Sequence, residues 1–149
     1  MIHLHRQGVI HRDLAARNIL LDAAFRPKVA DFGMSRVTLD NIANQTDNSV
    51  GPIKWMSPES LTKREYSTKS DVWSFGVVIY EVLTRETPYK DYNLMQIGTL
   101  VAMGNLKLVE ELEKKGEKYP AKIVEIMNMC MQFTPEKRPE FSEIVDMFD

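Results

Sequence analysis

One long apolar segment, residues 71–85, sets the strongest limit on how this chain of 149 residues can fold. Its centre reads Val72-Trp73-Ser74-Phe75-Gly76-Val77-Val78-Ile79-Tyr80-Glu81-Val82-Leu83, which places apolar side chains on nearly every side of a helix. A helix of this kind is stable only where other elements cover it. We therefore expect a helix at 71–85 that is buried at the centre of the fold.

The rest of the sequence predicts more helices and little sheet. Residues 1–7 are typical of the last turns of a helix, which Gly8 would end. Short apolar segments at 19–21 and 27–30 predict a small β-hairpin, whereas the polar stretch 37–53 predicts a long loop. Helices are also expected at about 94–103, 121–132 and 140–148, the last of them after a break at Thr134-Pro135. The predicted fold class is mainly α.

The composition is that of one globular domain, with 44% hydrophobic residues and a net charge of −2. This charge gives no reason to expect nucleic acid or an anionic membrane as a partner. The one cysteine, Cys130, cannot form an internal disulfide, which favours a reducing compartment and predicts a cytoplasmic location. Residues 1–10 lack the apolar core of a signal peptide, and the longest apolar stretch, 77–80, is too short to span a bilayer. A membrane anchor elsewhere in a longer parent stays open.

Two short motifs carry the chemistry. The segment His11-Arg12-Asp13-Leu14-Ala15-Ala16-Arg17-Asn18, followed by Asp31-Phe32-Gly33, resembles the catalytic and metal-binding loops of eukaryotic protein kinases. Landmarks of the same family follow in the same order, so that the resemblance covers essentially the whole chain. They are Ser57-Pro58-Glu59, Asp71-Val72-Trp73-Ser74-Phe75-Gly76 and Lys137-Arg138-Pro139. The fold that this implies is a protein kinase-like C-lobe with a long activation loop.

The resemblance implies a role for each motif residue in phosphoryl transfer. Asp13 would orient the attacking hydroxyl and accept its proton, with Arg17 supplying positive charge beside it. Asn18 and Asp31 would hold Mg²⁺ on ATP, and Leu20 would line the floor of the adenine pocket and belong to the core. The partner would be a protein substrate.

Further positions would support this site. His11 and Phe32 resemble members of the hydrophobic stack of active kinases, and Gly33 completes the metal-binding motif. Asp71 would brace the backbone of the catalytic loop, or would be a simple acid at a helix N-terminus. The resemblance also implies an ion pair between Glu59 and Arg138. Arg12 would hold a phosphate on Thr38, Thr46 or Ser49, and an unmodified polar loop is the alternative at each of these sites.

Two markers favour tyrosine as the acceptor. Ser/Thr kinases usually carry a lysine two residues after the catalytic aspartate, where this chain has Ala15 and then Arg17. The segment Gly51-Pro52-Ile53-Lys54-Trp55-Met56 resembles the substrate platform of tyrosine kinases, with Pro52, Lys54 and Trp55 as its main members. Tyrosine-kinase-like Ser/Thr and dual-specificity kinases carry similar strings, and that alternative stays open.

The sequence also departs from the family. The segment Met34–Val50 contains no tyrosine, and the charged stretch 108–118 is longer than its counterpart in tyrosine kinases and predicts a solvated helical face. No glycine-rich G-x-G-x-x-G loop and no V-A-I-K-like lysine occur in the 149 residues. We therefore expect residues 1–149 to be a partial kinase domain without its N-lobe, with little activity alone. A pseudokinase or a binding fragment is the second interpretation.

Overall fold

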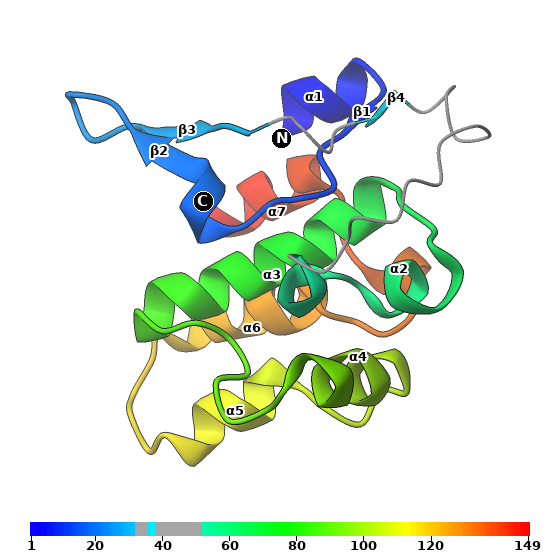
Figure 1. Cartoon of the computed structure of the whole chain (residues 1–149). Helices are drawn as coiled ribbons and strands as arrows, with labels where there is room; N and C mark the ends of the chain where they lie inside the picture. Colours follow the sequence, from blue (N-terminus) through cyan, green and yellow to red (C-terminus); the bar gives the residue numbers. More distant parts are fainter. Residues whose placement is uncertain (32–35, 38–51) are drawn as a thin grey trace.

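The helix expected at 71–85 runs through the middle of the computed structural model as α3, Thr68–Thr84 (Figure 1). It begins three residues earlier than predicted because a capping box starts it. The Ser67 hydroxyl accepts from the Lys69 amide at 3.1 Å, and the Ser70 hydroxyl accepts from the Ser67 amide at 2.8 Å. Residues from Ser70 to Tyr80 are buried with the exception of Phe75, as the apolar pattern requires.

The structure describes residues 1–31, 36–37 and 52–149. Helices dominate this part of the chain, which confirms the predicted class. In chain order the elements are α1 (Ile2–Arg6), β1 (Val9–Ile10), η1 (Ala16–Asn18), β2 (Ile19–Leu21), β3 (Pro27–Val29), β4 (Arg36–Val37), η3 (Ile53–Trp55), α2 (Pro58–Lys63), α3, α4 (Leu94–Ala102), α5 (Leu108–Lys114), α6 (Ala121–Cys130), η4 (Pro135–Lys137) and α7 (Phe141–Phe148).

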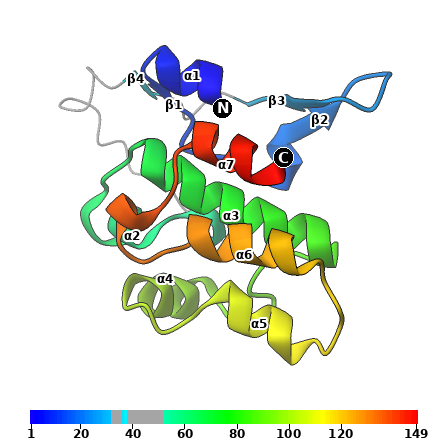
Figure 2. The same ribbon diagram turned by 180° about the vertical axis from the view of Figure 1, so that it is seen from behind.

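The elements lie in layers around α3. Figures 1 and 2 show α6 packed along α3, with α4 and α5 beneath the pair and α1, α7 and the strands above it. One continuous core joins these layers, and its deeply buried aliphatic members include Leu14 of the catalytic loop together with residues of α3 to α7: Val72, Val77, Ile97, Val101, Leu108, Leu112, Ile126 and Ile144. The large apolar area removed from water here is the main stabilising term of such a fold. None of the helices in the described ranges is long and apolar enough to cross a membrane.

The expected hairpin is present. Strands β2 and β3 pair antiparallel, with Ile19 opposite Val29 and Leu21 opposite Pro27. A second short antiparallel pair, β1 with β4, was not predicted, because strands of two residues leave no periodic signal.

The prediction that Leu20 belongs to the core is wrong. Its side chain is 56% exposed, and Leu21 beside it is also exposed. The two-stranded hairpin projects from the helical body, so that residues on its outer faces meet few neighbours (Figure 1).

Helices α1, α4, α6 and α7 each start and end within two residues of their predicted bounds. Helices α2 and α5 need separate comment. Helix α2 was not predicted, although its N-cap Ser57, its Pro58 at the first position and its left-handed C-cap Arg64 are ordinary end signals.

The charged stretch 108–118 is only partly the solvated helical face that was expected. In α5, Leu108 and Leu112 are buried against the core, because they lie one turn apart on the same side of the helix.

Candidate active site

The carboxylate of Asp13 is held from both sides by residues of η1. Arg17 donates from Nη2 to Oδ1, and Asn18 donates from Nδ2 to Oδ2 at 3.1 Å and to the Asp13 carbonyl at 2.8 Å. The short 3₁₀ turn causes this arrangement, because it folds residues four and five positions along the chain back onto Asp13. Three of the residues predicted to act in catalysis therefore meet at one point.

Asp71 braces the backbone of this loop. Its Oδ2 accepts from the His11 amide at 2.9 Å and its Oδ1 from the Arg12 amide at 3.0 Å, while the Asp71 side chain is 1% exposed. Arg12 has a φ of 72°, a left-handed conformation that costs a non-glycine residue about 1 kcal/mol or more. The two bonds to Asp71 hold this conformation, and Asp71 is at the same time an acidic residue in the first turn of α3.

His5 completes the surroundings of Asp71. Its Nε2 lies 2.8 Å from Asp71 Oδ2, and its ring packs edge-on against Phe141 with centroids 5.3 Å apart. This contact ties α1 to α3 and α7. No local pattern singles out His5, because its partner lies 66 positions away.

The ring of His11 connects the loop to the end of the hairpin. Its Nε2 donates to the Ala30 carbonyl at 2.9 Å, and its Nδ1 accepts from the Asp13 amide at 3.1 Å. The Ala30 amide also donates to the Asn18 carbonyl at 2.7 Å. Asp31 follows directly, with a left-handed φ of 58°. The hairpin therefore returns the chain beside Asn18 just before Asp31, as its sequence predicts.

The oxygen atoms available here suit Mg²⁺. The Asn18 amide nitrogen is turned toward Asp13, which leaves its Oδ1 as a possible metal ligand, and Asp31 follows Ala30, whose amide bonds the Asn18 carbonyl. No cluster of three His, Cys, Asp or Glu side chains that could hold a metal occurs in ranges 1–31, 36–37 and 52–149. Mg²⁺ does not need one, because it commonly takes one or two carboxylates together with substrate phosphates and water.

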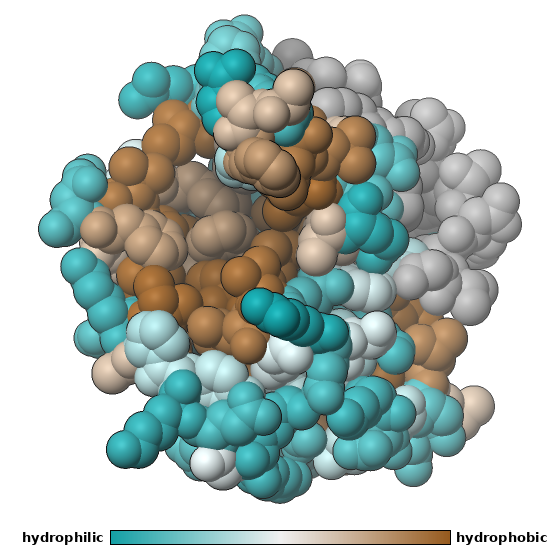
Figure 3. Space-filling view, turned by 90° about the vertical axis from the view of Figure 1, so that its left-hand side faces the viewer, coloured by the Kyte–Doolittle hydropathy of each residue, from teal (hydrophilic) through white to brown (hydrophobic). Residues whose placement is uncertain are grey.

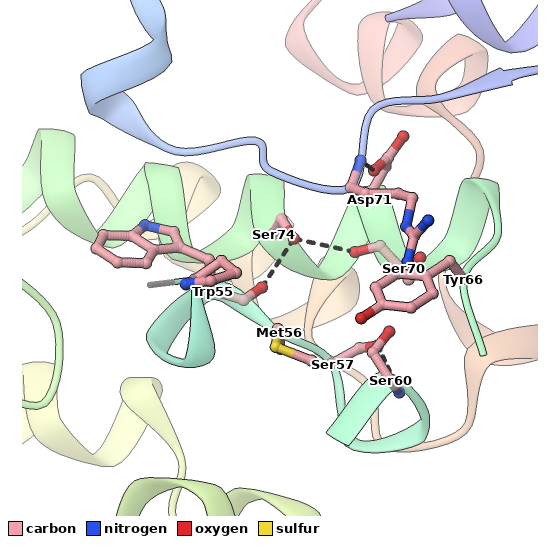
Figure 4. A pocket seen from close by; sticks show the side chains of 10 residues that line it. Trp55, Met56, Ser57, Ser60, Tyr66, Ser70, Asp71 and Ser74 are labelled. Atoms are coloured by element: carbon pink, nitrogen blue, oxygen red, sulfur yellow. Dashed lines mark hydrogen bonds between the residues drawn. The ribbon is translucent and has the colours of Figure 1, made fainter. Parts of the chain in front are cut away.

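The predicted substrate platform lies against the catalytic loop. Pro52 is buried and its carbonyl accepts from the Trp55 amide at 2.9 Å, which closes η3 with Lys54 at its centre. The guanidinium of Arg17 stacks over the Trp55 ring at 4.3 Å from the centroid. Figure 4 shows Ser74 of α3 beside this segment, and its hydroxyl donates to the Trp55 carbonyl at 2.8 Å.

A small pocket opens between the catalytic loop, the platform and α3 (Figure 4). The Arg12 guanidinium lies on its wall, 3.9 Å from the centroid of the Tyr66 ring. Arg12 Nε is buried and makes no hydrogen bond within the described residues. Arg12 is predicted to bind a phosphate on Thr38, Thr46 or Ser49. These three positions lie outside the described part of the chain, as do Phe32 and Gly33.

Arg138 and Glu59 form the expected ion pair. The guanidinium donates from Nη1 and Nη2 to the two carboxylate oxygens at 2.7 and 2.9 Å, with no exposure of the Arg138 side chain. Its remaining N–H groups donate to the carbonyls of Lys69, Gln132 and Phe133. This two-point geometry anchors the start of α2 to the segment before α7.

One central residue was missed. Glu81 of α3 accepts from the Ala16 amide at 2.9 Å and from Trp55 Nε1 at 3.0 Å, both at its Oε2. The sequence contains a feature that could have identified Glu81, because it is the only charged residue between Val72 and Thr84. A lone carboxylate in such a helix needs a partner, since burying one without compensation is costly.

Comparison with known families agrees with this geometry. The sequence profile of the family described as protein tyrosine and serine/threonine kinase matches residues 1–148. The match covers the catalytic loop, the platform and the whole helical body described above. The chain therefore belongs to the protein tyrosine and serine/threonine kinase family.

Proposed function

We propose that this chain is the catalytic-loop lobe of a kinase that transfers the γ-phosphoryl group of ATP to protein tyrosine. The observation that carries the proposal is the position of Asp13, whose two carboxylate oxygens are held by Arg17 and Asn18. A carboxylate fixed in this way can orient a hydroxyl and accept its proton as the phosphoryl group is transferred. Positioning of this kind, together with electrostatic stabilisation, supplies most of the rate enhancement in phosphoryl transfer.

Asn18 and Asp31 are the residues that would hold Mg²⁺. When bound, Mg²⁺ neutralises part of the negative charge on the ATP phosphates. The protein contributes the orientation of its ligands: the two bonds from Asn18 to Asp13 fix the amide, and the bond between Ala30 and Asn18 fixes the chain before Asp31.

The preference for tyrosine rests on Arg17 and the platform. Because Arg17 lies between the Asp13 carboxylate and the Trp55 ring, the acceptor must enter past a guanidinium and an indole. A phenolic ring that carries its hydroxyl far from the backbone suits such a site better than a serine, whose hydroxyl is bonded to Cβ. Pro52 lines the adjoining pocket together with Trp55.

One observation favours a second candidate, a tyrosine-kinase-like Ser/Thr kinase. The segment Met34–Val50 contains Thr38, Thr46 and Ser49 but no tyrosine. An enzyme that modifies its own activation loop would then act on a hydroxyl of serine or threonine.

The isolated chain is expected to bind Mg·ATP weakly and to transfer phosphate negligibly. Its 149 residues carry neither a glycine-rich phosphate loop nor a V-A-I-K-like lysine. Much of what would stabilise the negative charge on the ATP phosphates is therefore missing from these residues. Assay of the purified chain with a tyrosine-containing polymer tests this. Turnover comparable to that of an intact kinase would contradict it.

Two substitutions test the assigned roles in a chimera that joins a compatible kinase N-lobe ahead of Met1. Asp13→Asn should lower kcat by about 10² to 10⁴ while the affinity for Mg·ATP stays nearly unchanged. Asp31→Asn should weaken Mg·ATP binding as well, because Asp31 faces the metal. The exposed Asp146→Asn in α7 is the control and should change neither quantity. Equal losses of nucleotide affinity in the first two variants would contradict the assignment.

A further inference from the structure

Glu81 joins two parts of the site that are far apart in the sequence. Its Oε2 accepts hydrogen bonds from Ala16 in the catalytic loop and from Trp55 in the platform, at 2.9 and 3.0 Å. These donors lie 65 and 26 positions away from Glu81. One oxygen atom of the central helix thus fixes both segments.

On the loop side, Glu81 replaces a cap that the local sequence cannot provide. Ala16 begins η1, and Ala15 at the N-cap position has no side-chain acceptor. The first amides of a helical turn need acceptors from elsewhere. Because Arg17 follows Ala16 directly, the acceptor on Glu81 helps to set where the Arg17 side chain lies, whereas the Asn18 amide is held by its own two bonds to Asp13.

On the platform side, α3 holds Trp55 at two points. Ser74 donates to the Trp55 carbonyl at 2.8 Å, and Glu81 accepts from the indole at 3.0 Å. Seven residues are about two helical turns, so Ser74 and Glu81 lie on the same side of α3. Trp55 is therefore fixed in position and in ring orientation, and its face receives the Arg17 guanidinium.

We propose that Glu81 is a positioning residue for the protein acceptor: it sets the distance between the platform and Asp13 through Trp55 and Arg17. This inference rests on the proposed kinase function. Glu81 bonds neither Asn18 nor Asp31 among the contacts described, so that its loss should affect the acceptor peptide and not the nucleotide. In the chimera, Glu81→Ala should raise the KM for peptide by about fivefold or more and change the KM for ATP by less than about twofold.

Hydrogen exchange of the 149-residue chain tests the coupling without catalysis. The signals to follow are the Ala16 amide and the Trp55 indole N–H. In Glu81→Ala both should exchange about tenfold faster or more, because each loses a charged acceptor. Glu81→Gln keeps an acceptor oxygen at the same distance and should stay within about threefold of the parent.

Two further proteins make the test specific. Glu81→Asp keeps the charge but is one methylene shorter, so hydrogen exchange of at least one of the two donors should become faster. This variant replaces Glu81→Ala in the test if Glu81→Ala does not fold. Glu86→Ala is the matched control, since its carboxylate bonds only to Lys90 and Lys115 among the described contacts. The buried Trp73 indole reports on the core, and its exchange should not change.

The outcomes separate the inference from the proposed function. Unchanged exchange at Ala16 and Trp55 in both Glu81→Ala and Glu81→Asp would overturn the inference, as would equal acceleration at Trp73. A rise in the KM for ATP equal to that for peptide would also overturn it. If no form of the chimera transfers phosphate, the kinase proposal fails, whereas the exchange result still decides whether Glu81 couples the two segments.

Discussion

Gly76 and Met131 bring helix α3 against the end of α6 at a distance that no larger residue allows. A Cβ atom placed on Gly76 would overlap Met131 Cγ and lie 3.2 Å from Cys130 Cβ. The Cγ atom is close to the backbone, so that Met131 cannot simply swing away. The packing of the central helix on α6 therefore depends on the absence of a side chain at position 76.

Gly76→Ala should lower the free energy of unfolding by about 1–3 kcal/mol, because the added methyl overpacks the α3–α6 contact. The matched control is Gly98→Ala in α4, where a Cβ would meet nothing within 4 Å. That change should stabilise the chain by about 0.5–1 kcal/mol through helix propensity. Urea unfolding of both variants measures the difference, and equal effects would contradict the described packing.

Arg138→Lys should destabilise the chain by about 3 kcal/mol, although it keeps the charge. A lysine cannot bond both oxygens of Glu59 and three carbonyls at once, and it would leave buried acceptors without donors. Lys137→Ala, at the exposed neighbouring position, should stay within about 0.5 kcal/mol of the parent. A loss in Arg138→Lys no larger than in this control would contradict the structural role of the pair.

Stability should fall at alkaline pH through Cys130. Burial raises the pKa of this thiol from 9.0 to about 12. Between these values the unfolded chain releases the thiol proton while the folded chain keeps it, so the free energy of unfolding decreases as pH rises. For this group the loss approaches about 1.4 kcal/mol per pH unit above pH 9. Denaturant unfolding at pH 8 and 10 measures it, and Cys130→Ala should remove this part of the slope.

An apolar hollow on one face predicts association or dye binding. Figure 3 views the left-hand side of Figure 1 and shows hydrophobic residues lining a depression there. The hairpin and the ends of α3 and α7 lie on this side, and the exposed apolar residues of these elements include Leu20, Leu21, Val82 and Phe148. Patches of this kind commonly mark contact surfaces. The purified chain should self-associate or bind a hydrophobic dye. A monodisperse monomer without dye binding would show that this face is stable in water.

Local pattern predicted the helical class, the hairpin and most helix positions. The central helix is the clearest example, since its apolar residues fix both its type and its burial. Capping at Ser67 and Ser70 moved its start, because a capping box depends on two residues that the apolar period does not include.

The contacts that organise the site could not be predicted in this way. Glu81 meets Ala16, and His5 meets Asp71, across more than 60 positions, and no local preference encodes such distances. Leu20 shows the opposite failure. Its apolar character predicted burial, whereas a hairpin that projects from the body leaves it exposed.

The central claim is that the acceptor is tyrosine, and phosphoamino-acid analysis of the chimera's products tests it most directly. With a mixed substrate that offers tyrosine, serine and threonine, phosphotyrosine should predominate if the proposed role of Arg17, which lies between Asp13 and the Trp55 ring, is correct. The Asp13→Asn form of the same chimera should yield no phosphoamino acid above background. Predominant phosphothreonine or phosphoserine, lost in that same variant, would contradict the claim and assign the chain to the tyrosine-kinase-like Ser/Thr class.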